Sequence, residues 1–292
     1  MKITIKNDRF EVCVDSYGAQ LCSLRSADGT EYLWQGDPEI WKEHAPNLFP
    51  YIGRMTDKSY VCQGKTYHMN IHGIAKYREF ELEEQSDTAL VFRLDSDEDT
   101  LSAYPFSFTF RVLFTLKENR LEITYRVTNS GEQKMYYGVG GHPGFCVPNQ
   151  PDTGFSEYYL EFEPDVEPRR VVFSEDCFIM DGQEEAFPLE QGSLKLAHEL
   201  FDQDAVVLVN SGHSVSLRCQ KSKKNIRVSY PDMPYVGFWH KPHSQAPYVC
   251  IEPWSSLPSR QGVVEDLEKQ ENLCSLEAGR TRDNCWSIEI EE

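Results

Sequence analysis

Apolar and polar residues alternate along much of the chain, most clearly in two neighbouring segments. Residues 106–116 read FSFTFRVLFTL and residues 121–127 read LEITYRV. Both are rich in aromatic and β-branched side chains, and a period of two residues is typical of a strand with one buried face. The intervening residues 117–120 have the length and turn chemistry of a hairpin. The pattern therefore predicts an antiparallel strand pair.

Short segments of the same kind recur throughout the sequence, whereas helical signals are few. Helix candidates are limited to residues 38–45, 196–201 and 263–271, and the hydrophilic residues 95–100 resemble a solvated turn. Many short strands at near-regular spacing predict an all-β fold, a large antiparallel β-sandwich or a barrel, with a few short helices. The further strand candidates are residues 10–14, 32–34, 80–83, 90–94, 135–139, 158–162, 171–173, 205–209, 215–218, 226–230, 236–239, 248–251 and 286–290.

No clear boundary divides the chain. The loop at residues 148–153 (PNQPDT) contains turn residues, but strands of the same style continue on both sides of it. All-β domains often exceed about 200 residues. We therefore expect residues 1–292 to form a single domain, with a hydrophobic content of 40% that is enough for a substantial core.

Charge narrows the range of partners. Lys and Arg total 29 and Asp and Glu total 47, which gives a formal net charge of −18. Such a surface repels nucleic acid and anionic lipid, and no apolar run approaches the ~18 residues of a membrane-spanning helix. We therefore expect neither nucleic acid nor a membrane as a partner. A neutral small molecule is the simpler ligand, because a phosphorylated one would need a local basic pocket.

The cysteines and the first residues bear on the cellular compartment. Nine cysteines are present, none in a CxxC spacing, and several lie inside apolar runs. The first residues alternate like a strand and lack the apolar run of a signal peptide. These features predict reduced thiols in a cytoplasmic protein.

Four segments break the alternation with clustered glycine, proline, histidine and acidic residues. Loops held by a rigid sheet are common places for binding and catalytic sites. Each segment also has a purely structural interpretation, such as a surface ion pair, a histidine beside a turn or a capping carboxylate. The segments are residues 47–54 (NLFPYIGR), 70–78 (NIHGIAKYR), 138–145 (GVGGHPGF) and 248–254 (YVCIEPW).

Each segment contributes candidate chemistry. Arg54 is a multidentate donor to hydroxyl or carboxylate oxygens, and the glycine after His72 would let the backbone approach a ligand. Glycines around His142 would give its imidazole the access that a general acid or base needs. Glu252 ends an apolar strand, where a carboxylate requires a partner or a chemical role. Trp254 offers an aromatic face of the kind that often supports a sugar ring.

Other polar residues carry weaker signals. Asp202 and Asp204 precede a predicted strand and could face the same end of the sheet. His240 and His243 resemble a loop edge. The apolar surroundings of Cys146 favour an inert thiol over a nucleophile.

Five motifs, in this order, resemble the aldose 1-epimerase (galactose mutarotase-like) family, and most closely its lactose-operon-associated bacterial branch. The resemblance implies a large antiparallel β-sandwich that interconverts the α and β anomers of an aldose without a cofactor or a metal. It also implies a small-molecule sugar as the partner of a monomer or homodimer. The motifs are residues 48–54 (LFPYIGR), 72–75 (HGIA), 140–145 (GGHPGF), 234–239 (PYVGFW) and 250–254 (CIEPW).

The resemblance also implies roles for individual residues. Glu252 matches the catalytic base, His142 the general acid, and His72 a second histidine that contacts the sugar. Arg54 lies in the family's Gly-Arg segment, and Trp254 follows the base. The sugar-binding aspartate is either Asp202 or Asp204, with Asp204 favoured.

The chain departs from the family at one point. True galactose mutarotases usually carry Asn-Arg four residues after the glycine of the Gly-Arg segment, whereas this chain has Asp57 and Lys58. The arginine that would grip substrate hydroxyls is therefore replaced by Arg54 or Lys58, and the identity of the sugar stays open.

Three other functions fit the same residues. One is a hexose-6-phosphate 1-epimerase, which would need several basic residues around a phosphate. Another is a sugar-binding protein that has the cleft without turnover. The third is a metalloenzyme that uses His72, His142 and Glu252 as a two-histidine, one-carboxylate site.

Overall fold

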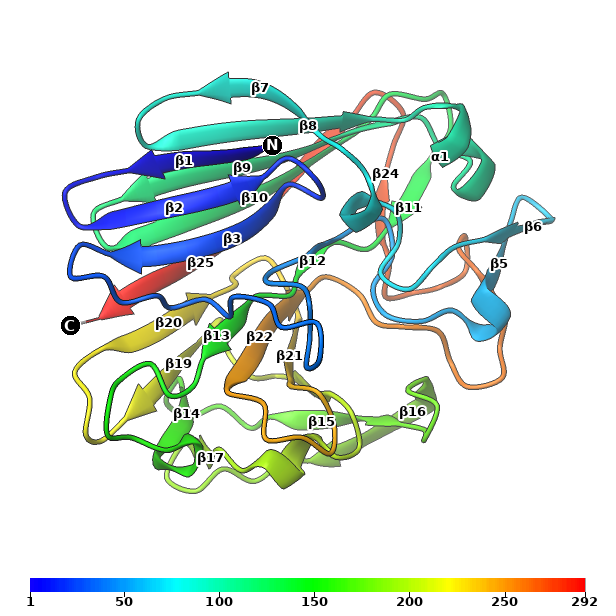
Figure 1. The fold of residues 1–292 in the computed structure, drawn as a ribbon. Coiled ribbons are helices and arrows are strands. Elements are labelled where there is room, and N and C mark those ends of the chain that lie inside the picture. Colours follow the sequence, from blue (N-terminus) through cyan, green and yellow to red (C-terminus); the bar gives the residue numbers. More distant parts are fainter. Residues whose placement is uncertain (292) are drawn as a thin grey trace.

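The computed structural model describes residues 1–291, and its largest elements are two antiparallel sheets that pack against each other (Figure 1). The sandwich predicted from the alternating pattern is confirmed. The nine-stranded sheet contains, in spatial order, β17 (Ser193–Lys195), β14 (Tyr158–Phe162), β19 (Ser214–Cys219), β20 (Asn225–Ser229), β25 (Thr281–Glu291), β10 (Arg120–Asn129), β9 (Phe108–Lys117), β8 (Ala89–Asp95) and β7 (Glu81–Gln85).

The second large sheet carries most of the candidate residues. Its central strand β22 (Tyr248–Trp254) pairs on one side with β21 (Tyr235–Trp239) and on the other with β12 (Gly140–Gly141) and β13 (Gly144–Cys146). The remaining strands are β16 (Ile179–Ala186), β15 (Arg169–Phe173) and β18 (Val206–Val209) beyond β21, and β4 (Asn47–Leu48) beyond β12.

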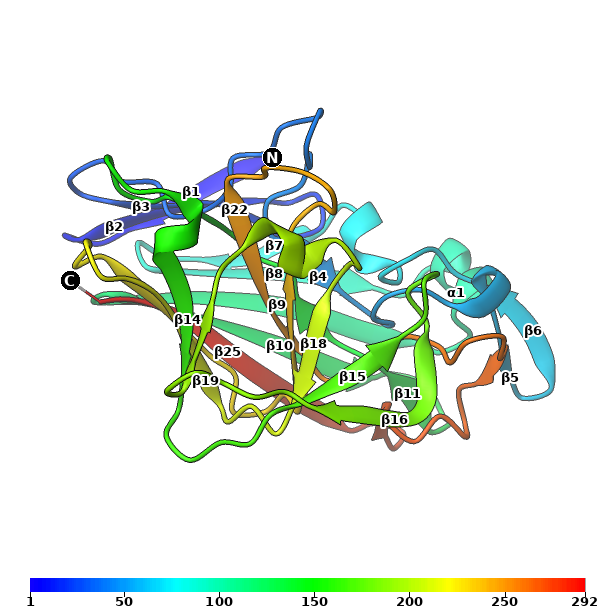
Figure 2. The same ribbon diagram turned by 90° about the horizontal axis from the view of Figure 1, so that it is seen from below.

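Smaller elements complete the molecule, and the sheet of the first three strands lies over β7–β10 of the large sheet (Figures 1 and 2). That sheet contains β1 (Lys2–Lys6), β2 (Phe10–Asp15) and β3 (Gln20–Ser26). The others are β5 (Ser59–Cys62) with β6 (Lys65–His68) and β23 (Glu265–Asp266), and β11 (Met135–Tyr137) with β24 (Cys274–Leu276). The helices are α1 (Glu98–Ala103) and the 3-10 turns Thr56–Lys58, Ala75–Tyr77, Phe155–Glu157 and His198–Phe201.

The strongest alternating segments form the centre of the nine-stranded sheet. β9 and β10 pair in an antiparallel register that begins at Lys117 and Arg120, so the predicted hairpin is confirmed. Alternate residues of β10, such as Ile123 and Tyr125, are fully buried. The hydrophobic effect therefore drives one face of this hairpin into the core.

The same alternation gives the second sheet two different faces. Phe238 of β21 and Ile251 of β22 belong to the main hydrophobic core between the sheets. Their neighbours Trp239, Cys250 and Glu252 point to the opposite face, because successive side chains in a strand alternate. That opposite face carries the cleft described below.

The helix predictions were mostly wrong. Residues 38–45 form a turn and residues 263–271 contain β23 and further turns, whereas only residues 196–201 include helical structure, as a 3-10 turn. The expected turn at residues 95–100 overlaps α1, which Asp97 caps through its side chain. Within residues 1–291, no helix has both the length and the apolar composition needed to cross a membrane.

Candidate active site

The strand register places two candidate residues opposite each other. β12 pairs with β22 through Gly140 and Trp254, and β13 continues the same antiparallel register further along β22. His142 lies in the gap between β12 and β13, where the chain leaves the ladder. By that register His142 stands directly across from Glu252 of β22.

The side chains of His142 and Glu252 are in contact. His142 Nε2 lies 3.3 Å from Glu252 Oε2. Glu252 is 1% exposed and His142 is 8% exposed, yet neither carboxylate oxygen nor His142 Nδ1 has a hydrogen-bond partner among the described residues. Burying a carboxylate without hydrogen bonds is costly. Hydroxyl groups of a bound ligand would supply the missing bonds.

Burial shifts the two proton affinities in opposite directions. Desolvation raises the pKa of Glu252 well above its usual value, and the charge of Asp204 adds to the rise. Desolvation lowers the pKa of His142 to about 3, and the charge of Lys76 adds to the fall. Burial therefore favours the neutral form of both groups, and an ionised Glu252 carboxylate would be an unusually strong base for its type.

His72 lies next to this pair as a neutral donor. Its ring centroid is 5.5 Å from that of His142, and the two rings are nearly perpendicular. The backbone N–H of Gly53 donates to His72 Nδ1 (3.2 Å), so the proton of the neutral ring is assigned to Nε2. Desolvation holds the pKa of His72 well below its usual value. His72 thus offers an uncharged N–H to a ligand.

Arg54 and Asp204 form an ion pair at the edge of the cleft. Arg54 Nη1 lies 3.2 Å from Asp204 Oδ2, while the indole N–H of Trp239 donates to Asp204 Oδ1 (2.6 Å). The two contacts fix the aspartate from both sides. The Arg54 side chain is 44% exposed, so part of its guanidinium stays available to a ligand.

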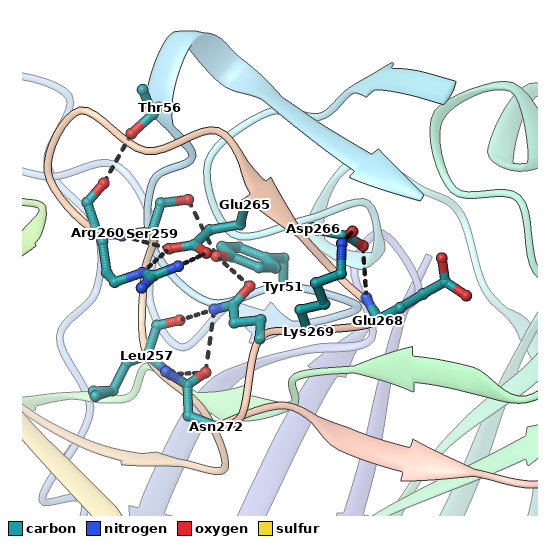
Figure 3. Close-up of polar contacts among 11 residues, drawn as sticks. Tyr51, Thr56, Leu257, Ser259, Arg260, Glu265, Asp266, Glu268, Lys269 and Asn272 are labelled. Atoms are coloured by element: carbon teal, nitrogen blue, oxygen red, sulfur yellow. Dashed lines mark hydrogen bonds and ion pairs between the residues drawn. The ribbon is translucent and has the colours of Figure 1, made fainter. Parts of the chain in front are cut away.

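The loop that follows β22 contacts Tyr51 and Thr56, which lie on either side of Arg54 in the sequence (Figure 3). The N–H of Ser259 donates to the carbonyl of Arg54 (3.0 Å), and the hydroxyls of Ser259 and Tyr51 lie 3.2 Å apart. Arg260 in the same loop pairs with the buried Glu265, with Nη2 2.9 Å from Oε2. These contacts hold the segment of Arg54 against the loop that follows β22.

A second ion pair lines the cleft and was missed by sequence analysis. Lys76 Nζ lies 2.8 Å from Glu43 Oε2, and the Lys76 side chain is only 8% exposed. Both residues line the same cavity as His142. One sequence signal was available, because Lys76 lies in the same segment as His72. A lysine is rarely buried without a partner, so a lysine in that segment would need a carboxylate nearby.

Two tryptophans that were not predicted as site residues form an aromatic wall. Trp41 packs on the ring of His142, with centroids 5.1 Å apart, and meets Trp239 edge-on at 5.5 Å. Trp41 comes from the wrongly predicted helix at residues 38–45, where the N–H of Asp37 donates to the Trp41 carbonyl (2.9 Å) and closes a turn. Trp254 is only 4% exposed, so it offers a ligand less surface than these two.

The cleft brings together the six residues predicted for the site and leaves out two alternatives. The carboxylate of Asp202 accepts from the backbone N–H of His243 (3.0 Å) and is not part of the cleft lining. Lys58 lines a separate hollow. The six in the cleft are Arg54, His72, His142, Asp204, Glu252 and Trp254.

The size and charge of the cleft limit its ligand. Its cavity volume is about 230 Å³, below the roughly 300–1,000 Å³ of pockets for drug-sized ligands. The two cations in it, Arg54 and Lys76, are each paired with a carboxylate, Asp204 and Glu43. The arrangement suits a small polar molecule without a large negative charge.

Comparison with known proteins gives consistent matches along the chain. A family model described as aldose 1-epimerase matches residues 1–271. The chromosomal protein LacX of Lactococcus lactis subsp. lactis is 32% identical, over 96% of this chain and 97% of that protein. A galactose mutarotase related enzyme from Lactobacillus acidophilus is 35% identical with a TM-score of 0.95, covering 100% of this chain and 98% of that one. A galactose mutarotase-like protein from Lactobacillus casei is 33% identical with a TM-score of 0.94, covering 100% of both chains.

Proposed function

The chain belongs to the aldose 1-epimerase family, and from that premise we propose that it interconverts the α and β anomers of a free aldose by acid–base ring opening. The observation that carries the proposal is the contact between His142 and Glu252 in a cleft of monosaccharide size. One group that can accept a proton and one that can donate a proton are enough for this reaction.

Ring opening needs the pair in its charge-separated form. That form has the shared proton on His142 and a free carboxylate on Glu252. Glu252 takes the proton of the anomeric hydroxyl while His142 gives a proton to the ring oxygen, and the bond between C1 and the ring oxygen breaks. The product is the open-chain aldehyde, with a protonated Glu252 and a neutral His142.

Ring closure reverses the proton transfers on the other face. Rotation about the C1–C2 bond turns the aldehyde, and the former ring oxygen attacks C1 from the opposite side. Its proton returns to His142, and Glu252 protonates the new anomeric oxygen. The cycle restores both groups, so no net proton or electron is consumed.

The remaining side chains would orient the sugar. The Nε2–H of His72 is placed to donate to a sugar oxygen, and the exposed part of Arg54 can do the same. Asp204 can accept from a hydroxyl, since it is fixed by Trp239 and Arg54. Trp254 closes the cleft beside the base. Such fixed donors and acceptors hold the anomeric centre at the acid–base pair.

We also place this activity in the cytoplasm. All nine cysteines are free thiols. A reducing compartment maintains that state.

The direct test is polarimetry of freshly dissolved α-D-glucose and α-D-galactose. We expect the wild type to accelerate mutarotation and Glu252→Gln to lose at least about 10²-fold of that rate, the contribution of one general acid or base. Asp202→Asn is the matched control, because it makes the same change outside the cleft lining and should keep the full rate.

A wild-type protein that fails to accelerate mutarotation of any aldose in a wider panel would contradict the proposal. Saturable sugar binding by that protein, measured calorimetrically, would then identify the cleft as a binding site without turnover.

A further inference from the structure

A buried thiol lies beside the His142–Glu252 pair. Cys250 precedes Glu252 by two residues on β22, so both side chains project from the same face of the strand. The ligand atoms of His142, Cys250 and Glu252 all lie within 4.8 Å of one another, and all three residues are buried. The metal set considered from the sequence had His72 in the place that Cys250 takes here.

We propose that His142, Cys250 and Glu252 form a binding site for a thiophilic divalent cation such as Zn²⁺ or Cd²⁺. A thiolate, an imidazole and a carboxylate are ligands that zinc accepts, and three protein ligands leave one position open. Because His142 and Glu252 line the cleft, water or a sugar hydroxyl would fill that open position.

One observation and one charge argument point to a ligand in this cluster. Neither oxygen of Glu252 has a hydrogen-bond partner among the described residues, although the side chain is 1% exposed. If the cation displaced the Cys250 proton, the resulting thiolate and the Glu252 carboxylate would carry two negative charges, which balance a divalent cation. The occupied cluster would therefore be electrically neutral, as a buried site requires.

Metal binding would also stop the reaction proposed above. The cation would occupy the carboxylate and the imidazole that transfer protons, so epimerase activity and metal occupancy exclude each other. The proposal that the cluster binds a metal is argued from its geometry and does not depend on the proposed function. The proposal that the metal inhibits the enzyme does rest on the proposed function. The two parts can therefore fail separately.

The test is a titration of the chelator-treated full chain with Cd²⁺, followed by the ultraviolet charge-transfer absorption of the cadmium–thiolate bond. We expect one Cd²⁺ per wild-type chain to produce this absorption and to inhibit mutarotation. Cys250→Ser should weaken Cd²⁺ binding more than about tenfold, because even outer-shell groups contribute about 10–100-fold to metal affinity. It should keep its mutarotation rate when Cd²⁺ is present.

Two further variants keep the test decisive. Cys250→Ala removes the ligand without a buried hydroxyl and serves if the serine variant does not fold. Cys177→Ser is the matched control, because Cys177 is a free thiol that lines the same cleft outside the cluster, and it should behave as the wild type.

Equal Cd²⁺ affinity in the wild type and both Cys250 variants would overturn the proposal. So would loss of the absorption in Cys177→Ser alone. A wild type that binds Cd²⁺ through Cys250 but never accelerates mutarotation would support the metal site and contradict the proposed activity.

Discussion

The proposed chemistry depends on how burial shifts the proton affinities of His142 and Glu252. Water would favour the charged form of each group, whereas burial makes charge costly and favours the neutral form of both. Both residues were proposed from sequence, because each stands in a segment that breaks the strand pattern. Their 3.3 Å contact follows from the strand register, which residue types alone do not specify.

Lys76 should affect the pH at which the acidic limb of the kcat/KM profile falls. Its charge opposes protonation of His142, and its removal would leave the negative charge of Glu43 uncompensated nearby. In Lys76→Met, the acidic limb of kcat/KM should move to higher pH by roughly one unit, as expected for the loss of one nearby charge. Lys76→Arg keeps the charge and is the control. An unchanged limb in Lys76→Met would show that Lys76 has only a structural role.

Glu252 should make the stability of the protein decrease at higher pH. Desolvation raises its pKa in the folded state well above its ordinary value of 4.5. Between these two pKa values the folded protein keeps a proton that the unfolded chain has lost, so the stabilisation present below pH 4.5 is lost as pH rises through the folded pKa.

Replacing Glu252 by Gln should abolish this loss of stability at higher pH, because Gln does not ionise. The free energy of unfolding of Glu252→Gln should exceed that of the wild type by an amount that grows above pH 4.5, by up to about 1.4 kcal/mol per pH unit. Urea denaturation at several pH values measures the difference. A constant difference from pH 5 to pH 8 would contradict a raised pKa.

At the scale of elements, most of the long strands were predictable and the short helices were not, while the strand predicted at residues 32–34 is only an isolated bridge. Strand alternation is a long signal that burial of one face enforces. In residues 263–271, by contrast, tertiary contacts override local preference, because Glu265 is buried against Arg260 and pairs with β5. The sequence contains the capping pair of α1, Asp97 and Thr100. The surrounding residues are so polar that they were interpreted as a solvated turn.

Gly140 should be essential for the pairing of β12, the strand that directly precedes His142. A Cβ at this position would lie 2.7 Å from the carbonyl oxygen of Pro253 and 3.0 Å from the ring of Trp254. Gly140→Ala would therefore push β12 away from β22, with a loss of about 1–3 kcal/mol of stability, as is usual for overpacking. Mutarotation should slow because His142 moves with β12.

The control for this change is Gly154→Ala. No atom lies within 4 Å of a Cβ built at Gly154, so neither stability nor rate should change. Urea denaturation and polarimetry measure both effects. A Gly140→Ala variant with wild-type stability would show that the two strands can separate without cost.

At the scale of the whole molecule, charge and cleft architecture favour the same class of ligand. The net charge of −18 sets a negative field around the protein. In the cleft, Arg54 and Lys76 could attract an anion, but each already has a carboxylate partner. A free aldose meets neither obstacle, whereas a sugar phosphate must overcome the field and compete with those carboxylates.

This argument predicts a lower KM for a free hexose than for its 6-phosphate. The KM for the free hexose should not depend on salt, while the KM for the 6-phosphate should fall as salt screens the repulsion, since the Debye length shortens to about 8 Å at physiological ionic strength. Mutarotation rates of glucose and glucose 6-phosphate at two salt concentrations measure both. The opposite result would be a KM that is lower for the 6-phosphate than for the free hexose and that rises with salt. It would indicate an attractive basic pocket and a hexose-6-phosphate 1-epimerase, because screening raises KM only when it weakens an attraction.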